Sequence, residues 1–287
     1  MRKQQKVLTI LLVILLIISA GWVWLMMRPT HDTTTTSKRI VVTTNAQAQI
    51  FNKLDIPLVG VPTPGDQQSL PKQYRDLPQV GNHVAPHLEK IGQLKPDLVY
   101  LDAAIASDYQ QKLDSDDIKH KQLKFDTLSD LKSAVTSLSN TYHKDAAAKK
   151  LNQSLSLPQQ HPKKQQNVLL LTGMPGGSFL VGTKHSYVGD LINQAGGHVV
   201  GSGSSPFVSM NAEQVAQSQP TVIITMAHAM PDSVFKNFDS LFNQSTWQNV
   251  PAVKEGHVYR AEEPKFSMTA NLNAPEAYQQ IRNWLKK

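Results

Sequence analysis

A helical run that ends at a proline and is followed by an apolar run occurs twice along the chain. Segments 86–100 and 210–224 each place a glutamate near the start of the helical run and a proline seven residues after it. A proline ends a helix, and an apolar run of this length is typical of a strand buried in a parallel sheet. The repetition predicts that one α/β lobe occurs twice in the chain.

The residues before these segments extend the repeat. In the first half, apolar strands are predicted at 40–44 and 57–61, with a helix between them. In the second half, a strand at 168–172 is followed by a helix at 187–195 and a strand at 198–201. Alternation of this kind predicts parallel sheets with helices on both faces. Two such lobes should leave a cleft between them, which is the usual place for a small ligand.

Residues 127–157 contain neither proline nor glycine, and their apolar side chains recur at helical spacing. Thr127 followed by Asp130 is a helix start signal, and Pro158 supplies the end. One continuous helix here would be about 45 Å long at 1.5 Å per residue and would join the lobes rigidly. Two shorter helices, broken near Lys144, are the alternative.

Residues 7–27 form an almost unbroken apolar stretch, with three basic residues before it and one after it. At about 1.5 Å per residue the stretch can cross a hydrocarbon layer of about 30 Å. The preceding positive charges favour a cytoplasmic N-terminus, which places the rest of the chain outside the cell. A cleaved signal peptide is the alternative, but residues 18–20 form a poor cleavage site and the apolar run continues past them.

The chain contains no cysteine, so it has neither disulfides nor a cysteine that could carry a lipid anchor. Any tether to the membrane must therefore be the N-terminal helix. The formal charge of +7 comes from lysines spread among polar residues rather than from a dense basic stripe with aromatic residues. This distribution argues against nucleic-acid binding and favours a solvated basic surface near an anionic envelope.

These patterns predict four parts of the chain. They are a membrane anchor and linker at 1–37, an N-terminal α/β lobe at 38–126, a connecting helix at 127–158 and a C-terminal α/β lobe at 159–287.

Four strings carry a resemblance to a known family, namely residues 171–181, 184–191, 227–231 and 258–271. They resemble the IsdE-type haem-binding proteins of Gram-positive bacteria, which belong to the ABC-transporter substrate-binding proteins. The resemblance runs from about residue 38 to the C-terminus. It implies the class III periplasmic-binding-protein fold, with two Rossmann-like lobes joined by a single long helix. The N-terminus departs from this family, whose members carry a lipid-anchored cysteine.

The resemblance implies that a histidine of the second lobe and a methionine of the first hold the haem iron. The histidine corresponds to His228, just after the predicted strand 221–225, where ligands bind in open α/β sheets. The methionine corresponds to Val84, whose side chain cannot bind iron. The neighbouring His83 is the expected second ligand, and His87 is a weaker candidate because it begins a helix. The alternatives are five-coordinate iron, a bound water, or a cargo other than haem.

Further contacts to haem are also implied by the resemblance. They come from the end of the first strand, from the position next to His83, and from methionines in the family-like strings. These residues are Asn45, Ala46, Val84, Met174, Met230 and Met268. Flexible filling of the core is the alternative role of the methionines.

Glu89 and Glu213 match the acidic residues, one on each lobe, with which the family docks against arginines of its permease. An exposed charge can orient a partner while contributing little to folding. A carboxylate near a helix N-terminus is also favourable in itself, and both roles can hold together.

The sequence thus predicts a monomeric, membrane-anchored protein that captures haem b outside the cell and passes it to an ABC permease, with no catalysis of its own. A ferric siderophore or a cobalamin-type compound is the alternative cargo. Two different kinds of function also compete with transport, namely a ligand sensor and a hydrolase acting through His228. The chain has no Gly-x-Ser-x-Gly motif for such a hydrolase.

Overall fold

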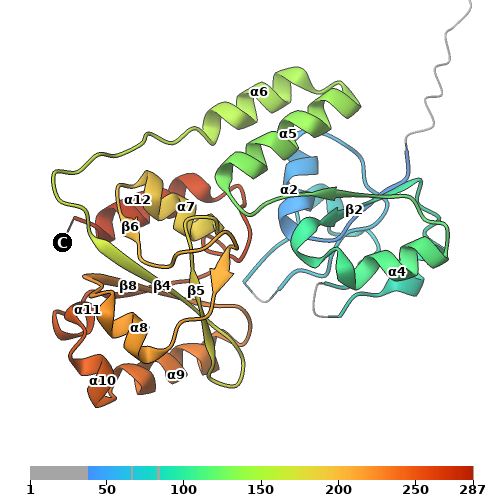
Figure 1. The fold of residues 1–287 in the computed structure, drawn as a ribbon. Coiled ribbons are helices and arrows are strands. Elements are labelled where there is room, and N and C mark those ends of the chain that lie inside the picture. Colours follow the sequence, from blue (N-terminus) through green and yellow to red (C-terminus); the bar gives the residue numbers. More distant parts are fainter. Residues whose placement is uncertain (1–37, 66, 83–84, 287) are drawn as a thin grey trace, which may run out of the picture. The chain divides into compact units, whose positions relative to one another are not determined.

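The computed structural model describes residues 38–65, 67–82 and 85–286, which belong to one compact unit, Lys38–Lys287 (Figure 1). Within these ranges, no helix is both long enough and apolar enough to span a bilayer. The predicted anchor and linker, residues 1–37, lie outside the described residues. Below, residues 38–126 are called the first lobe and residues 159–287 the second lobe.

The first lobe contains a parallel sheet in the order β1 (Ile40–Val42), β2 (Leu98–Asp102), β3 (His120–Leu123). Every residue of β1 and β2 is buried, as their apolar runs predict. The predicted strand at 57–61 is reduced to two parallel bridges, Val41 to Gly60 and Val61 to Gln79. This shortening is consistent with a proline at its first position, because proline has no amide hydrogen to donate to a neighbouring strand.

The two helices predicted for the first lobe are present as α2 (Asn45–Lys53) and α3 (Leu88–Gln93). The lobe also contains η1 (Lys72–Tyr74), η2 (Ala103–Ile105) and α4 (Ser107–Ser115), which were not predicted. Helix α2 begins directly after β1 because Thr44 and Gln47 form a capping box. Its buried face carries Ala48, Ile50 and Phe51, and the Phe51 ring meets the Tyr100 ring of β2 edge-on at 5.1 Å.

The expected continuous connecting helix is wrong, and the alternative of two helices holds. Helix α5 (Leu128–Tyr142) begins at the predicted Thr127–Asp130 capping box and ends at His143, whose φ of 56° is left-handed. Helix α6 (Asp145–Ser154) then packs against α5, with Asn152 Nδ2 donating to Thr136 Oγ1 at 3.0 Å (Figure 1). The hydrogen bond from Ser139 Oγ to Asp145 Oδ1, at 2.7 Å, stabilises the turn between them.

The second lobe contains six strands: β4 (Asn167–Gly173), β5 (Phe179–Gly182), β6 (His198–Val199), β7 (Phe207–Val208), β8 (Val222–Ala227) and β9 (Val258–Ala261). The order is β7-β5-β4-β8-β9, with β6 also paired to β4. Strands β4, β6, β8 and β9 pair in parallel, but β5 is antiparallel to both β4 and β7. The prediction of a purely parallel sheet is therefore wrong for this lobe. The short turn in which Met174 N donates to Ser178 O sends the chain straight back, and so short a connection joins only antiparallel strands.

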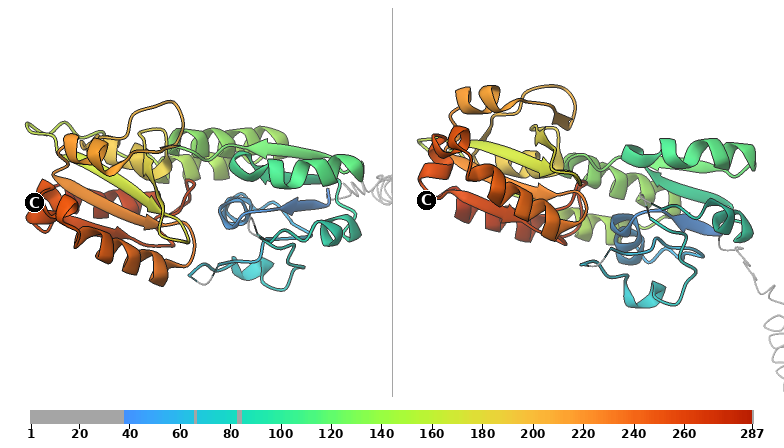
Figure 2. Two further views of the ribbon diagram at one scale, coloured as in Figure 1. Left: turned by 60° about the horizontal axis from the view of Figure 1, so that its bottom comes forward. Right: turned by 90° about the horizontal axis from the view of Figure 1, so that it is seen from below.

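Helices cover both faces of this second sheet (Figure 2). Val168 and Leu170 of β4 pack in the cluster that includes α7 (Tyr187–Gln194) and α12 (Ala274–Trp284). The alternate residue Leu169 packs in the cluster that includes α9 (Pro231–Phe242). A strand buried on both faces reads as a continuous apolar run. The shorter helices are α8 (Ala212–Gln217), α10 (Ser245–Gln248) and α11 (Pro251–Lys254).

The predicted internal repeat is confirmed. Glu89 and Glu213 lie in the first turns of α3 and α8, and the apolar strands β2 and β8 follow these helices. The second lobe differs by its inserted strands β5 and β7.

Candidate ligand-binding site

His228 directly follows β8, at the carboxyl end of the central strands of the second sheet. Ala227, the last residue of β8, pairs with Gly173, the last residue of β4, and His228 N donates to Gly173 O at 3.1 Å. The His228 side chain is half-buried. Met174 follows β4 at the same edge and is also half-buried. His228 and Met174 thus follow paired neighbouring strands at the carboxyl edge of the sheet, which is where open α/β sheets bind their ligands.

A carboxylate that the sequence analysis missed lies near this imidazole. Glu263 comes two residues after β9, and its Oε2 accepts a hydrogen bond from Gln68 Nε2 of the first lobe at 2.9 Å. Burial raises the pKa of the Glu263 carboxyl above its usual range, while the hydrogen bond from Gln68 and the charge interaction with His228 lower it. The sequence could have indicated Glu263 as a site residue, because it lies just beyond a parallel strand and inside the family-like string 258–271.

The three methionines named as haem contacts differ in exposure. Met230 is 62% exposed and has a left-handed φ of 51° at the N-cap of α9. Met268 is half-buried, as Met174 is. Met230 therefore does not fill the core, whereas Met226, which is 2% exposed, does.

In the first lobe, Asn45 and Ala46 begin α2 just beyond β1, and both are half-buried. Asn45 Oδ1 is buried and accepts no hydrogen bond from the described part of the chain. His83 and Val84 lie outside the described residues. His87 is exposed and precedes α3 as its N-cap residue.

Comparison with known proteins identifies the family. The model of the family described as periplasmic binding protein matches residues 40–264. The chain belongs to the periplasmic binding protein family. This is a family of transport binding proteins and not of enzymes.

Two periplasmic binding proteins are similar over most of the chain. The high-affinity heme uptake system protein IsdE of Staphylococcus aureus is 36% identical over 250 residues, which covers 84% of this chain and 85% of IsdE. The crystal structure of S. aureus IsdE complexed with heme matches with a TM-score of 0.79 and 34% identity, over 87% of this chain and 99% of that one. An ABC-transporter substrate-binding protein from Listeria monocytogenes matches with a TM-score of 0.78 and 35% identity, over 87% and 98% of the two chains.

Glu89 and Glu213, the two glutamates that the sequence analysis expects to dock against a permease, are both exposed. Glu89 lies in the first turn of α3. Glu213 lies in the first turn of α8, which starts with a capping box between Asn211 and Gln214. The helix-terminus role and the docking role both fit this placement.

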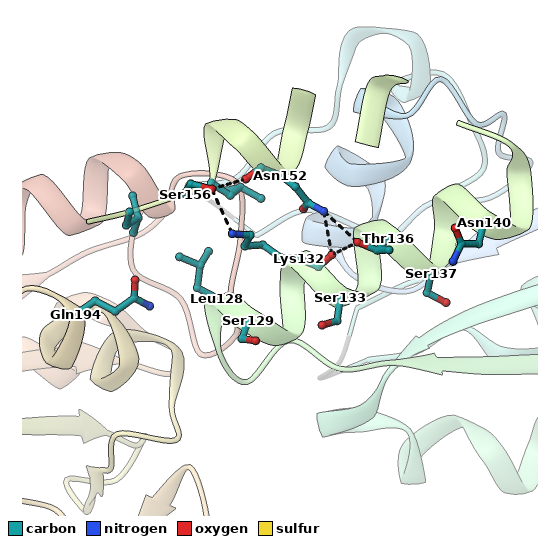
Figure 3. Close-up of a pocket in the computed structure, with 12 residues that line it drawn as sticks. Leu128, Ser129, Lys132, Ser133, Thr136, Ser137, Asn140, Asn152, Ser156 and Gln194 are labelled. Atoms are coloured by element: carbon teal, nitrogen blue, oxygen red, sulfur yellow. Dashed lines mark hydrogen bonds between the residues drawn. The ribbon is translucent and has the colours of Figure 1, made fainter. Parts of the chain in front are cut away.

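A polar groove of about 810 Å³ lies elsewhere, along α5 and α6 and beside Gln194 at the end of α7 (Figure 3). Its polar groups largely bind one another, since Lys132 Nζ donates to Ser156 Oγ at 3.2 Å and Asn152 Nδ2 to Thr136 Oγ1 at 3.0 Å. None of the predicted site residues lines this groove.

Proposed function

We propose that this periplasmic binding protein captures haem b outside the cell and delivers it to an ABC permease for iron uptake. The observation that carries the proposal is His228 at the carboxyl end of β8, in a chain 36% identical to IsdE over 84% of its length. A neutral imidazole is a good ligand for haem iron, and a loop beyond a parallel strand can present it. The protein's work is reversible ligation, with no chemistry performed on the haem.

His83 is the proposed second ligand of the iron. Val84, which matches the family's methionine, has no atom that could bind a metal, whereas His83 next to it does. Iron held by two imidazoles would be low-spin and six-coordinate, and this state gives a distinct absorption spectrum.

The haem macrocycle would lie against Met174, Met230 and Met268 on the second lobe, and against Asn45, Ala46 and Val84 on the first. The exposure of Met230 supports this arrangement, because a flexible thioether held outside the core is suited to a flat apolar ligand.

Delivery would use Glu89 and Glu213, whose exposed carboxylates are available to basic residues of a permease. The apolar stretch at 7–27 would hold the protein at the outer face of the membrane as a monomer.

The test is an absorption titration of the purified protein with haem beside a ferric siderophore. Wild-type protein should give a sharp Soret band, and His228→Ala should weaken haem binding by about a hundredfold, or about 2.7 kcal/mol. His198→Ala is the matched control, because His198 is exposed on β6 of the same lobe. An unchanged spectrum in His228→Ala would remove His228 from the site. If the protein binds the siderophore but does not bind haem, the alternative cargo is favoured. The presence of Val84 in place of the family's methionine is the reason for testing this alternative.

A further inference from the structure

Residues 262–273, which follow β9, bond to the first lobe near both of their ends. Near the start of this segment, Glu263 Oε2 accepts a hydrogen bond from Gln68 Nε2 at 2.9 Å. Near its end, Ala270 N donates to Phe125 O at 2.6 Å. The shape of segment 262–273 therefore sets where this part of the second lobe meets the first.

The side-chain amide of Asn271 is the centre of a hydrogen-bond network inside this segment. The segment contains no helix or strand, and Asn271 is 6% exposed. Its Nδ2 donates to Ser267 Oγ at 2.8 Å and to Pro264 O at 3.3 Å. Its Oδ1 accepts from Asn273 N at 2.8 Å. A buried polar group whose hydrogen bonds are made in this way specifies one local conformation.

Met268, one of the proposed haem contacts, lies within this network. The Ser267 hydroxyl accepts from Asn271 and donates to Thr269 O at 2.7 Å. This hydroxyl thus bridges the backbone on the two sides of Met268, whose side chain is half-buried. A binding segment that is ordered before its ligand arrives loses less entropy on binding.

Glu263 is held by the same amide group. The carbonyl of Pro264, the next residue, accepts from Asn271 Nδ2 and, at 2.9 Å, from Asn273 Nδ2. These bonds fix the backbone beside Glu263, and with it the place where the carboxylate meets Gln68. One buried amide thereby supports a proposed cargo contact and a contact between the lobes.

Two other side chains anchor the segment to α12 of its own lobe. Phe266 is 2% exposed, and its ring stacks on the Trp284 ring at 5.4 Å. Lys265 Nζ donates to Gln280 Oε1 at 2.6 Å. Because these contacts do not involve Asn271, loss of the Asn271 amide should change the shape of the segment without releasing it from the second lobe.

We propose that Asn271 is a positioning residue of the haem site, which holds residues 262–273 in the shape that offers Met268 to the cargo and Glu263 to the first lobe. The inference rests on the proposed function where it concerns haem, and it names what orders this part of the site before haem arrives. Asn271 itself is not proposed to touch the haem or its iron.

Hydrogen exchange of the Ala270 amide in the haem-free, full-length protein tests the shape of the segment. Ser267→Ala removes the hydroxyl that bonds to Asn271, and Ser267→Thr retains it. Exchange should be about fivefold faster in Ser267→Ala, the factor that one hydrogen bond contributes, and near the wild-type rate in Ser267→Thr. Asn271→Ala removes all three bonds and should exceed this effect, but the two Ser267 variants decide if it does not fold. Equal exchange in wild type and both Ser267 variants would overturn the proposal.

The Val99 amide, which bonds to Lys119 O inside the first lobe at 2.9 Å, is the internal control. Its exchange should be the same in wild type and in Ser267→Ala. If it accelerates as much as that of Ala270, the substitution destabilises the whole protein and the proposal fails.

Haem dissociation, measured by transfer to apomyoglobin, tests the link to the cargo. It should be about fivefold faster from Ser267→Ala and near the wild-type rate from Ser267→Thr. In a background that carries Met268→Ala and Gln68→Ala, adding Ser267→Ala should change the rate by less than about twofold, because the contacts that it positions are already absent. A full fivefold effect in that background would overturn the link to these contacts.

The two measurements separate this inference from the proposed function. If Ser267→Ala accelerates exchange of the Ala270 amide but not haem dissociation, the role in positioning the cargo is refuted. If the wild-type protein binds no haem, the proposed function fails and the cargo role fails with it. Exchange in the haem-free protein then still decides whether Asn271 shapes the contact between the lobes.

Discussion

The two lobes share an order of elements, yet the carboxyl ends of their strands carry different chemistry. In the second lobe, His228 follows β8 and Glu263 lies beyond β9, so that edge offers an imidazole and a carboxylate near it. In the first lobe, the described residues at the corresponding edge are Asn45 after β1 and the buried Asp102 at the end of β2. One edge offers groups that can bind a metal, and the other offers a half-buried amide and a buried carboxylate.

This difference teaches that a repeated scaffold does not require a repeated site. A parallel strand followed by a loop presents whatever residue comes next, because the strand fixes the loop's position and not its chemistry. The inserted β5 adds to the asymmetry, since the turn before it places Met174 at the same edge as His228.

The largest effect should come from the core that both lobes share. Phe51 is fully buried against Tyr100 and Tyr142, in a cluster that continues into the second lobe. Phe51→Ala should lower the free energy of unfolding by about 3–5 kcal/mol. Urea unfolding followed by circular dichroism and by tryptophan fluorescence should give one common, shifted transition. A tryptophan signal that keeps its wild-type midpoint would mean that the lobes unfold separately.

The second prediction asks whether the first lobe also supplies a metal ligand. His83→Ala should convert low-spin haem iron to a high-spin form and weaken binding about tenfold, or about 1.4 kcal/mol. The exposed His87 provides the matched variant, and His87→Ala should leave the spectrum unchanged. Absorption and magnetic circular dichroism report the spin state. If His83→Ala retains the wild-type spectrum, the proposal of two imidazoles is wrong.

A third prediction concerns the one function for which the lobes should be equivalent. Glu89→Lys combined with Glu213→Lys should reduce haem uptake by cells about tenfold, because each lobe would lose a docking charge. Haem binding and stability should change by less than about 1 kcal/mol, since both side chains are exposed. Reversal of the exposed Glu255 is the control. Loss of haem binding in the double variant would point to a structural role.

Sequence patterns predict the fold where it depends on neighbouring residues. The glutamate-led helices, the proline-led strands and the Thr127–Asp130 start of α5 are all local signals. The break at His143 has no such local signal. His143 adopts a left-handed conformation, and the residues that usually indicate this conformation are glycine and asparagine. The antiparallel pairing of β5 is not local either, because a short apolar run does not reveal the direction of the strand beside it.

The candidate site divides in the same way. The position of His228 at the sheet edge could be predicted from the apolar strand that precedes it. Glu263 could not be recognised in this way, because its hydrogen-bond partner, Gln68, lies 195 residues away in the sequence. Asp102 is likewise an ordinary strand-end residue in the sequence, and only the folded chain shows that it is buried. Contacts between distant segments depend on tertiary packing, and no local pattern encodes them.

The smallest expected effect tests whether that distant contact contributes to holding the cargo. Gln68→Ala removes the hydrogen bond from Gln68 Nε2 to Glu263 Oε2, which joins the lobes. A partly exposed bond of this kind contributes about 1 kcal/mol, so haem should dissociate about fivefold faster. Because this bond lowers the pKa of Glu263, its loss should raise that pKa further. Stopped-flow transfer of haem to apomyoglobin measures the rate, and Gln67→Ala, at an exposed neighbouring position, should leave it unchanged. Equal rates in wild type and Gln68→Ala would show that the hydrogen bond between Gln68 and Glu263 does not contribute to the retention of haem.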